Sequence, residues 1–225
     1  MHIVESGSRP SRPLDRLVRV LGGHCPLGEE ERRAVEELPH EVRSVAKGTR
    51  LIRAGETQDH CYVVLSALAQ KVKYSGDLRR VVAINLPGEI VNAEAVLALA
   101  SDYSAEVFRA GELAVIPASA IRGLVFSFPP LARALWLRSQ AEAAIYREWL
   151  LNDSRGDLRT RMAHLLAETA ARLEFVNAGA GAEPIVPLDA ASLPGPSALL
   201  PSTSSARWSR FTTTVPSPSA RKACW

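Results

Sequence analysis

Between residues 41 and 117, short apolar runs alternate with turn sequences, and this pattern restricts the fold more than any other feature of the chain. Lys71–Tyr74 alternates polar and apolar residues, as a half-buried strand does. The turn sequence around Gly76 favours a hairpin, and Arg79–Ile84 predicts its returning strand. Further strands are expected at Ser104–Phe108 and Glu112–Ile116. Many short strands at this spacing predict an antiparallel sandwich or roll.

The segments on either side of this region carry helical patterns. Residues 14–39 place acids at Glu29–Glu31, where the start of a helix favours negative charge. Ala118–Phe128 predicts a short helix that two prolines end. Residues 131–152 contain neither Pro nor Gly, and at 1.5 Å per residue they predict a rod of roughly 33 Å. Asp157–Glu174 predicts a second helix with one apolar face.

Composition excludes several classes of protein. The net charge of +3 comes without a dense Lys/Arg block, so it permits a nucleic-acid partner without indicating one. Three widely spaced cysteines favour a reducing compartment over a disulfide framework, and they lack the close pairs of a Cys-ligated metal site. Residues 1–13 do not resemble a signal peptide, and no apolar run reaches the ~18 residues of a membrane span. We therefore expect a cytoplasmic protein without a membrane partner.

The sequence contains no motif that predicts catalysis. The five histidines form no HxxxH or HExxH pair, and no GxSxG, P-loop or GxGxxG is present. His60 and Cys61 are neighbours on a predicted strand, so they point to opposite faces and cannot act as a pair. Cys25 and Cys61 are expected to be buried core thiols. We expect no enzyme, no metal site and no cofactor.

The order of elements and three motifs resemble the CRP/FNR family of bacterial transcriptional regulators. The motifs are residues 48–56, with GTRLIRAGE; residues 59–66, with DHCYVVLS; and residues 86–90, with LPGEI. The resemblance runs from about residue 28 to about residue 188. It implies an α+β fold, in which an antiparallel, jelly-roll-like β-roll effector domain is followed by a long dimerisation helix and a helical DNA-binding domain. It also implies a homodimer.

The resemblance divides the chain into five parts. Residues 1–12 are expected to be a flexible tail, and 13–130 the cyclic-nucleotide-binding-like effector domain with its flanking helices. Residues 131–152 correspond to the dimerisation helix. Residues 153–192 correspond to a remnant of the winged helix-turn-helix domain, which leaves that domain truncated, and 193–225 to a disordered or frameshifted tail.

The resemblance also places a candidate effector pocket. In nucleotide-binding relatives the Gly-Glu turn, here Gly88 and Glu89, precedes a ribose-contacting Glu, and an Arg-Ser pair meets the phosphate. These positions hold Ala93, Tyr103 and Ser104. Because Tyr cannot replace a guanidinium charge, we expect an unidentified small effector rather than cAMP or cGMP. Glu94 remains open between a shifted ribose contact and a solvent-facing residue.

The predicted rod carries an apolar stripe of Leu131, Leu135, Ile145 and Trp149. By the resemblance this stripe is the seam of a homodimer. The alternative is a core helix that packs on its own domain. Arg138 and Glu142 interrupt the stripe and keep both interpretations open.

The C-terminal segment departs from the family pattern. After Asp189 there is no acidic residue, and Ser, Thr and Pro make up half of residues 192–225, which cannot easily form a recognition helix. Read in the neighbouring frame, codons compatible with residues 201–204 can encode Pro-Val-His-Val. This string is similar to the start of the family's DNA-recognition helix. We hypothesise a one-base shift near codon 193. The alternative is a natural Ser/Thr-rich tail.

Two functions follow from these patterns. The first is a CRP/FNR-type regulator by descent that retains its sensor and dimer helix, while sequence-specific DNA binding is impaired. Arg159 and Arg161, with Arg172, then offer only weak, salt-sensitive phosphate contacts, or simply form an exposed helix face. The second is a stand-alone ligand-binding or protein-interaction module that does not bind DNA.

Overall fold

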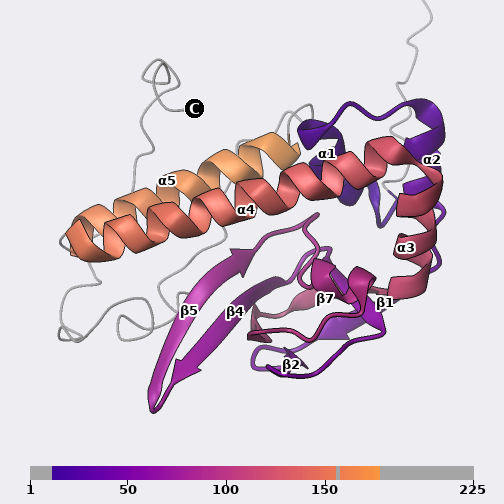
Figure 1. Ribbon diagram of the computed structural model, residues 1–225. Coiled ribbons are helices and arrows are strands. Elements are labelled where there is room, and N and C mark those ends of the chain that lie inside the picture. Colours follow the sequence, from indigo (N-terminus) through magenta and orange to yellow (C-terminus); the bar gives the residue numbers. More distant parts are fainter. Residues whose placement is uncertain (1–11, 156–157, 178–225) are drawn as a thin grey trace, which may run out of the picture.

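The computed structural model describes residues 12–155 and 158–177, which contain seven strands and five α-helices (Figure 1). Every strand pair is antiparallel. One sheet has the order β1-β7-β3, formed by Glu41–Val45, Gly111–Pro117 and His60–Val64. The other has the order β2-β6-β4-β5, formed by Arg50–Ile52, Ser104–Arg109, Leu68–Ser75 and Leu78–Asn85. The predicted antiparallel roll followed by helices is confirmed.

The predicted hairpin is the β4–β5 pair, which projects from the body of the roll (Figure 1). Its strands are joined by a two-residue loop after Ser75, and the first loop residue, Gly76, has φ of +57°. A positive φ at that position is typical of a type II′ turn, whose twist matches that of the flanking strands. The register shifts between Lys71 and Val72.

The helices agree with the periodic patterns, with one correction. α1 (Asp15–His24) and α2 (Glu29–Glu36) occupy the first helical region, and α3 (Ala118–Ser127) precedes the long helix. α4 runs from Pro129 to Arg155, so it includes the two prolines that were expected to precede it. Proline is tolerated in the first turn, where the amide has no intrahelical partner. α5 spans Leu158–Asn177.

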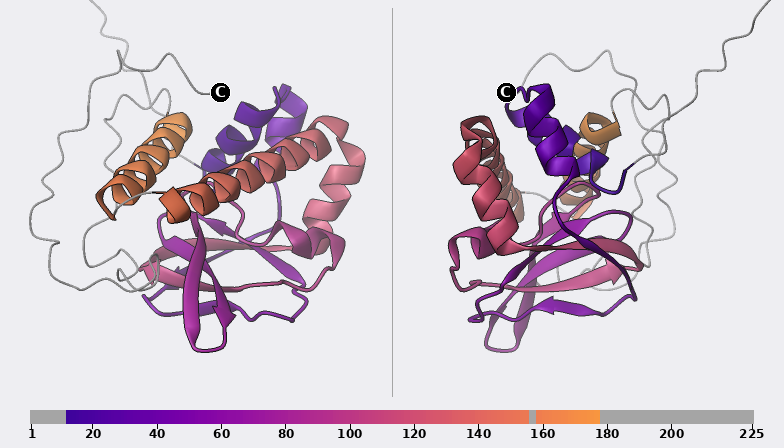
Figure 2. Two further views of the ribbon diagram at one scale, coloured as in Figure 1. Left: turned by 60° about the vertical axis from the view of Figure 1, so that its left-hand side comes forward. Right: turned by 90° about the vertical axis from the view of Figure 1, so that its right-hand side faces the viewer.

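α4 and α5 lie side by side above the strands, and α5 covers part of the four-stranded sheet (Figures 1 and 2). Met162, Leu165 and Leu173 of α5 pack with apolar side chains of β4, β5 and β6. These three residues and Thr169 are buried, as the predicted apolar face required. The helix therefore gains its stability from the sheet beneath it.

A second core joins α1, α2, α3 and the start of α4 to the three-stranded sheet. A third fills the space inside the roll and includes Tyr103. Among residues 12–155 and 158–177, no helix combines the length and the apolar character needed to cross a bilayer. The expected N-terminal tail, apart from residue 12, lies outside the described residues, as do residues 178–192 and the tail at 193–225.

Candidate functional site

The turn at Gly88 sits where the roll meets α1. Gly88 has φ of +93°, a conformation that favours glycine, and its amide donates to the carbonyl of Val64 at 2.7 Å. A Cβ at this position would lie 2.8 Å from the carbonyl oxygen of Arg16. Glycine is therefore required here by both backbone conformation and space. The local turn places the next residue, Glu89, under the helices.

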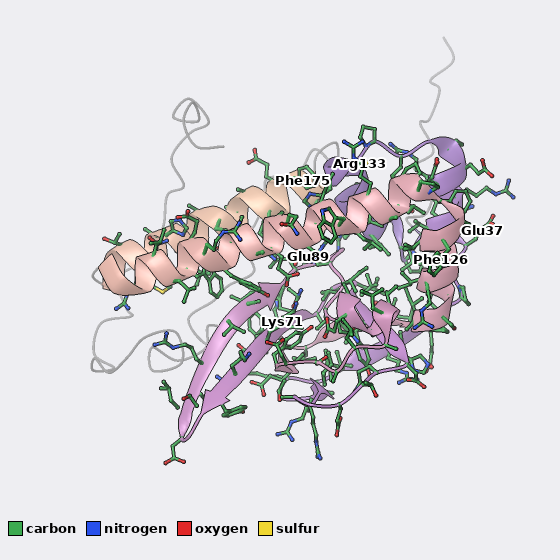
Figure 3. All side chains as sticks on the ribbon, viewed as in Figure 1. Glu37, Lys71, Glu89, Phe126, Arg133 and Phe175 are labelled. Atoms are coloured by element: carbon green, nitrogen blue, oxygen red, sulfur yellow. The ribbon has the colours of Figure 1, made fainter. Side chains whose placement is uncertain are left out.

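Glu89 points toward α4 and α5 (Figure 3). Its carboxylate accepts the amide of Leu86 at 2.9 Å and pairs with Arg172 at 2.6 Å, while Arg138 lies 3.7 Å away. Burial alone would raise the pKa of the Glu89 carboxyl, but the charges of Arg172 and Arg138 lower it below its ordinary value. The side chain therefore connects the roll to both helices.

The expected ribose position provides no polar group for a ligand. Ala93 begins the short 3-10 helix η1 (Ala93–Leu97) and packs against the helical core. Glu94, one residue later, accepts the hydroxyl of Ser101 at 2.5 Å and that of Tyr103 at 2.6 Å. Glu94 is half-buried and its carboxylate is engaged by two hydroxyls of the chain, which contradicts the solvent-facing interpretation.

Tyr103 stands where the resemblance places a phosphate-binding Arg. Its hydroxyl donates to Glu94 Oε1 at 2.6 Å and lies 2.8 Å from the Val91 carbonyl oxygen, and 8% of the residue is exposed. Burial, followed by the nearby charge of Glu94, raises the pKa of the phenol, so Tyr103 stays neutral. Lys71 Nζ lies 4.6 Å from the ring centroid.

Ser104, the second residue of the expected pair, has a structural role in this fold. Its hydroxyl accepts the amide of Ala54 at 3.1 Å and so links β6 to the turn after β2. The structure therefore brings Tyr103 and Glu94 together and uses Ser104 elsewhere. A carboxylate bonded to Tyr103 adds negative charge beside that residue, where it disfavours an anion.

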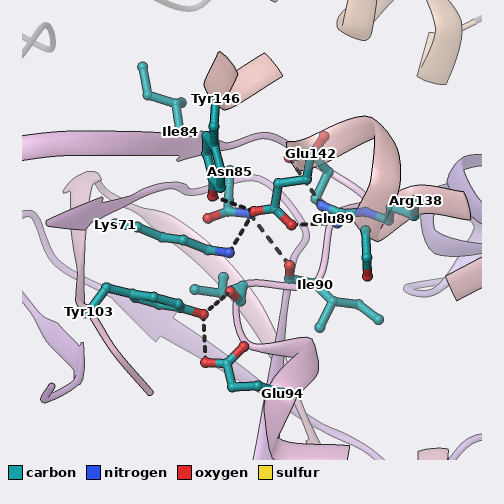
Figure 4. Close-up of polar contacts among 12 residues, drawn as sticks. Lys71, Ile84, Asn85, Glu89, Ile90, Glu94, Tyr103, Arg138, Glu142 and Tyr146 are labelled. Atoms are coloured by element: carbon teal, nitrogen blue, oxygen red, sulfur yellow. Dashed lines mark hydrogen bonds and ion pairs between the residues drawn. The ribbon is translucent and has the colours of Figure 1, made fainter. Parts of the chain in front are cut away.

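A buried ion pair joins the hairpin to the long helix (Figure 4). Lys71 Nζ of β4 lies 2.6 Å from Glu142 Oε1 of α4, and the Lys71 side chain is 7% exposed. Tyr146 donates to the same oxygen at 2.7 Å, and Arg138 lies 3.5 Å from the other. Burial favours a higher pKa for Glu142, but Lys71 and Arg138 lower it to about 2.

A second polar cluster holds α5 in place. Arg172 Nη1 bonds Glu168 at 2.8 Å, and its Nη2 donates to the carbonyl of Ile84 at 2.8 Å as well as to Glu89. Glu168 also accepts the indole N–H of Trp149 at 2.5 Å. The expectation that Arg172 contacts DNA phosphates is wrong for this structure, because its guanidinium is engaged inside the chain.

The sequence carried one signal for these polar clusters. Arg138 and Glu142 interrupt the apolar stripe of the rod, and both turn inward to meet Glu89 and Lys71. A polar residue on an otherwise apolar helix face indicates a buried partner when the helix covers a sheet. Nothing local to Lys71 indicates its burial, since its strand alternates like an ordinary half-exposed one.

The expected dimer stripe lies partly within the chain's own core. Leu131 is fully buried, and Leu135 packs against the helical core. Trp149 packs beside α5, and Ile145 is half-buried. Placement of Leu131 agrees with the alternative of a core helix, and the dimer seam stays a prediction. Arg161 lies beside the pocket described next, whereas the side chain of Arg159 lies outside the described residues.

A pocket of about 440 Å³ lies beneath α5. Its walls come from the β4–β5 hairpin, the Asp102–Tyr103 turn, the second half of α4 and the beginning of α5. This volume lies within the range of small-molecule sites. The lining residues that matter here are Lys71, Tyr103, Tyr146, Trp149 and Met162. The pocket borders Tyr103, one of the expected effector-pocket residues.

The two thiols that the structure describes are not placed for redox chemistry. Cys25 and Cys61 are both buried, as predicted for core thiols. Burial, with a smaller contribution from Glu94, raises the pKa of Cys61 to about 12, which keeps it protonated and unreactive. Within the part of the chain that the structure describes, no group of three or more His, Cys, Asp or Glu side chains is arranged to hold a metal ion.

Comparisons with known proteins identify the roll. Residues 42–128 match the family model of the cyclic nucleotide-binding domain. FixK2 from Bradyrhizobium japonicum is 21% identical, with a TM-score of 0.53 over 60% of this chain and 68% of that one. A cyclic nucleotide-binding domain from Methylobacillus flagellatus is 17% identical, with a TM-score of 0.52 over 64% and 86%. At these identities the two structures show the shared fold. A search of curated proteins returned no match.

Proposed function

We infer, from the cyclic nucleotide-binding domain that residues 42–128 form, that this chain is a CRP/FNR-type transcriptional regulator by descent. Its roll senses a small effector, its long helix pairs two copies, and its sequence-specific DNA binding is impaired. One observation supports the sensing role most directly: residues of the β4–β5 hairpin, α4 and α5 all line the same pocket. A ligand in this pocket contacts the roll and both of these helices.

The polar clusters give this arrangement a physical connection. Lys71 and Glu142 link the pocket wall to α4, and Glu89 with Arg172 links the Gly-Glu turn to α5. A ligand that changes how α5 sits against the roll changes these charge pairs as well. Coupling of this kind requires differential contacts in two states, and the pocket lies where such contacts arise.

The effector we propose is neither cAMP nor cGMP. Tyr103 stands at the sequence position of the family's phosphate-binding Arg and is bonded to Glu94, and the ribose-contacting Glu is replaced by Ala93. We expect isothermal titration calorimetry of the full chain to give no saturable binding of either nucleotide with a Kd below about 1 mM. Saturable micromolar binding would contradict this prediction. The Tyr103→Arg variant is the matched comparison, because it places the family's cation at that position.

The regulator proposal is tested by selection from a pool of random DNA duplexes. We expect the chain to retain DNA only weakly and without sequence preference, with binding lost at physiological salt. The matched control is the protein translated with the neighbouring frame restored after codon 193. We expect that protein to enrich one sequence. If it also enriches none, the chain is a stand-alone module. Enrichment by the chain itself would contradict the impairment.

A further inference from the structure

The pocket beneath α5 is lined by three aromatic side chains, and one of its sides follows α4. Tyr146, Trp149 and Asn152 are three residues apart, so they follow one another along the same side of the helix. Tyr103 from the turn and Met162 from α5 line the same cavity. Aromatic and thioether side chains favour a flat apolar body between them.

The polar groups around the pocket carry more positive than negative charge. Four lining side chains are cationic (Lys71, Lys73, Arg80 and Arg161), and two are carboxylates (Asp102 and Glu142). Each carboxylate pairs with one of the lysines, Asp102 with Lys73 and Glu142 with Lys71. The lining side chains thus carry four positive formal charges against two negative ones, a balance that favours an anionic over a cationic ligand.

One lining donor lacks an acceptor. The Asn152 Nδ2 atom is buried and has no hydrogen-bond partner among the residues that the structure describes. A buried unpaired donor is costly, so such a group indicates a missing acceptor. Because Asn152 follows Trp149 by three residues, an acceptor oxygen on the edge of a ring placed against Trp149 lies on its side of the pocket.

We propose that this pocket binds a small planar aromatic compound with one anionic oxygen group. Its ring lies between Met162 and the Tyr146–Trp149 wall, and its anionic group faces Asn152 Nδ2. The inference rests on the proposed sensor function and specifies the chemistry of its effector. The occupied pocket holds α5 against the hairpin, because the ligand touches both.

The test is calorimetry of the full chain with two probes of nearly equal shape, 1-naphthoate and the uncharged 1-naphthamide. We expect 1-naphthoate to bind about tenfold more tightly, since a charge-assisted hydrogen bond exceeds a neutral one by roughly that factor. Asn152→Leu reduces the affinity for 1-naphthoate and narrows the difference between the two probes. Equal affinities in the unmodified protein would overturn the proposed anionic group.

Two tryptophan substitutions on α4, one inside the pocket and one outside it, test whether 1-naphthoate binds in this pocket. Ala143 lines the pocket, so Ala143→Trp occupies it and abolishes binding of 1-naphthoate. Gln140→Trp places the same side chain at an exposed position of α4 and leaves binding unchanged. Far-ultraviolet circular dichroism confirms that each variant is folded, and Asn152→Leu replaces Ala143→Trp if the latter does not fold. Binding that survives Ala143→Trp, or an absence of binding to the unmodified chain, overturns the inference.

These outcomes are distinct from failure of the regulator proposal. The DNA selection uses the frame-restored protein and does not depend on either probe. A chain that enriches a sequence but ignores 1-naphthoate is a regulator with a different effector. A chain that binds 1-naphthoate as described and never selects DNA, even with its frame restored, is a sensor module of another kind.

Discussion

Replacing Glu89 with alanine lowers the free energy of unfolding by about 3–5 kcal/mol, the cost of breaking a buried ion pair by removing one partner. Glu89 is 7% exposed, and its loss leaves Arg172 and Arg138 buried without their shared carboxylate. It also removes the acceptor of the Leu86 amide. The measurement is urea-induced unfolding at pH 7, monitored by circular dichroism and tryptophan fluorescence.

The matched control for this substitution is Glu37→Ala. Glu37 also pairs with an arginine, Arg33, at 2.8 Å, but its side chain is 58% exposed and lies on the outer surface (Figure 3). Exposed pairs of this kind contribute about 0–1 kcal/mol. Glu89→Gln keeps the shape of the side chain and removes its charge. Its loss in the free energy of unfolding is therefore expected to lie between those of Glu89→Ala and Glu37→Ala. A loss below about 1 kcal/mol for Glu89→Ala would show that water, rather than protein, solvates the two arginines.

The second large effect is a dependence of the free energy of unfolding on pH. Acid destabilises the fold because it protonates Glu142. The pKa of Glu142 is about 2 in the folded chain, against an ordinary value of 4.5. The folded state thus binds fewer protons than the unfolded state between these values. The resulting stabilisation is complete above pH 4.5 and is lost as the pH falls toward 2. It amounts to about 3 kcal/mol, at 1.36 kcal/mol for each pKa unit.

Urea unfolding at pH 7, 5, 4 and 3 measures this loss. Glu142→Gln is expected to flatten the dependence below pH 4.5, although it also lowers stability at pH 7 because Lys71 remains buried without its partner. Glu41→Gln is the control, since Glu41 pairs with Arg43 at 2.7 Å on the surface, with 64% of its side chain exposed. If the stability of the unmodified protein is constant from pH 5 to pH 3, the lowered pKa of Glu142 does not stabilise the fold.

The sequence predicted the parts of the site that depend on the local backbone. Gly88 was expected to lie in a functional turn, and its φ of +93° explains why glycine stands there. The expectation that Tyr at position 103 is incompatible with a bound cyclic nucleotide stays a prediction. The structure shows that the Tyr103 hydroxyl is bonded to Glu94. That bond joins residues nine apart through a 3-10 helix that no periodic pattern predicted.

The rod was interpreted from one stripe, and that stripe proved insufficient. A single helix pattern distinguishes an apolar face from a polar one, but it does not say whether the apolar face meets the same chain or another. Leu131 lies in the chain's own core, while Arg138 and Glu142 face the roll. The interruptions of the stripe therefore carried more information about the site than the stripe itself.

The sequence by itself determined the strand pattern, the β4–β5 hairpin, the Gly-Glu turn and the apolar face of α5. These depend on side-chain alternation, backbone freedom and helical period, all of which act within a few residues. Only the tertiary structure decided which charges meet and where the pocket lies. Lys71 and Glu142 are 71 residues apart, and Glu89 and Arg172 are 83 apart. Electrostatic pairing depends on distance in space, which the packing of α4 and α5 on the roll sets.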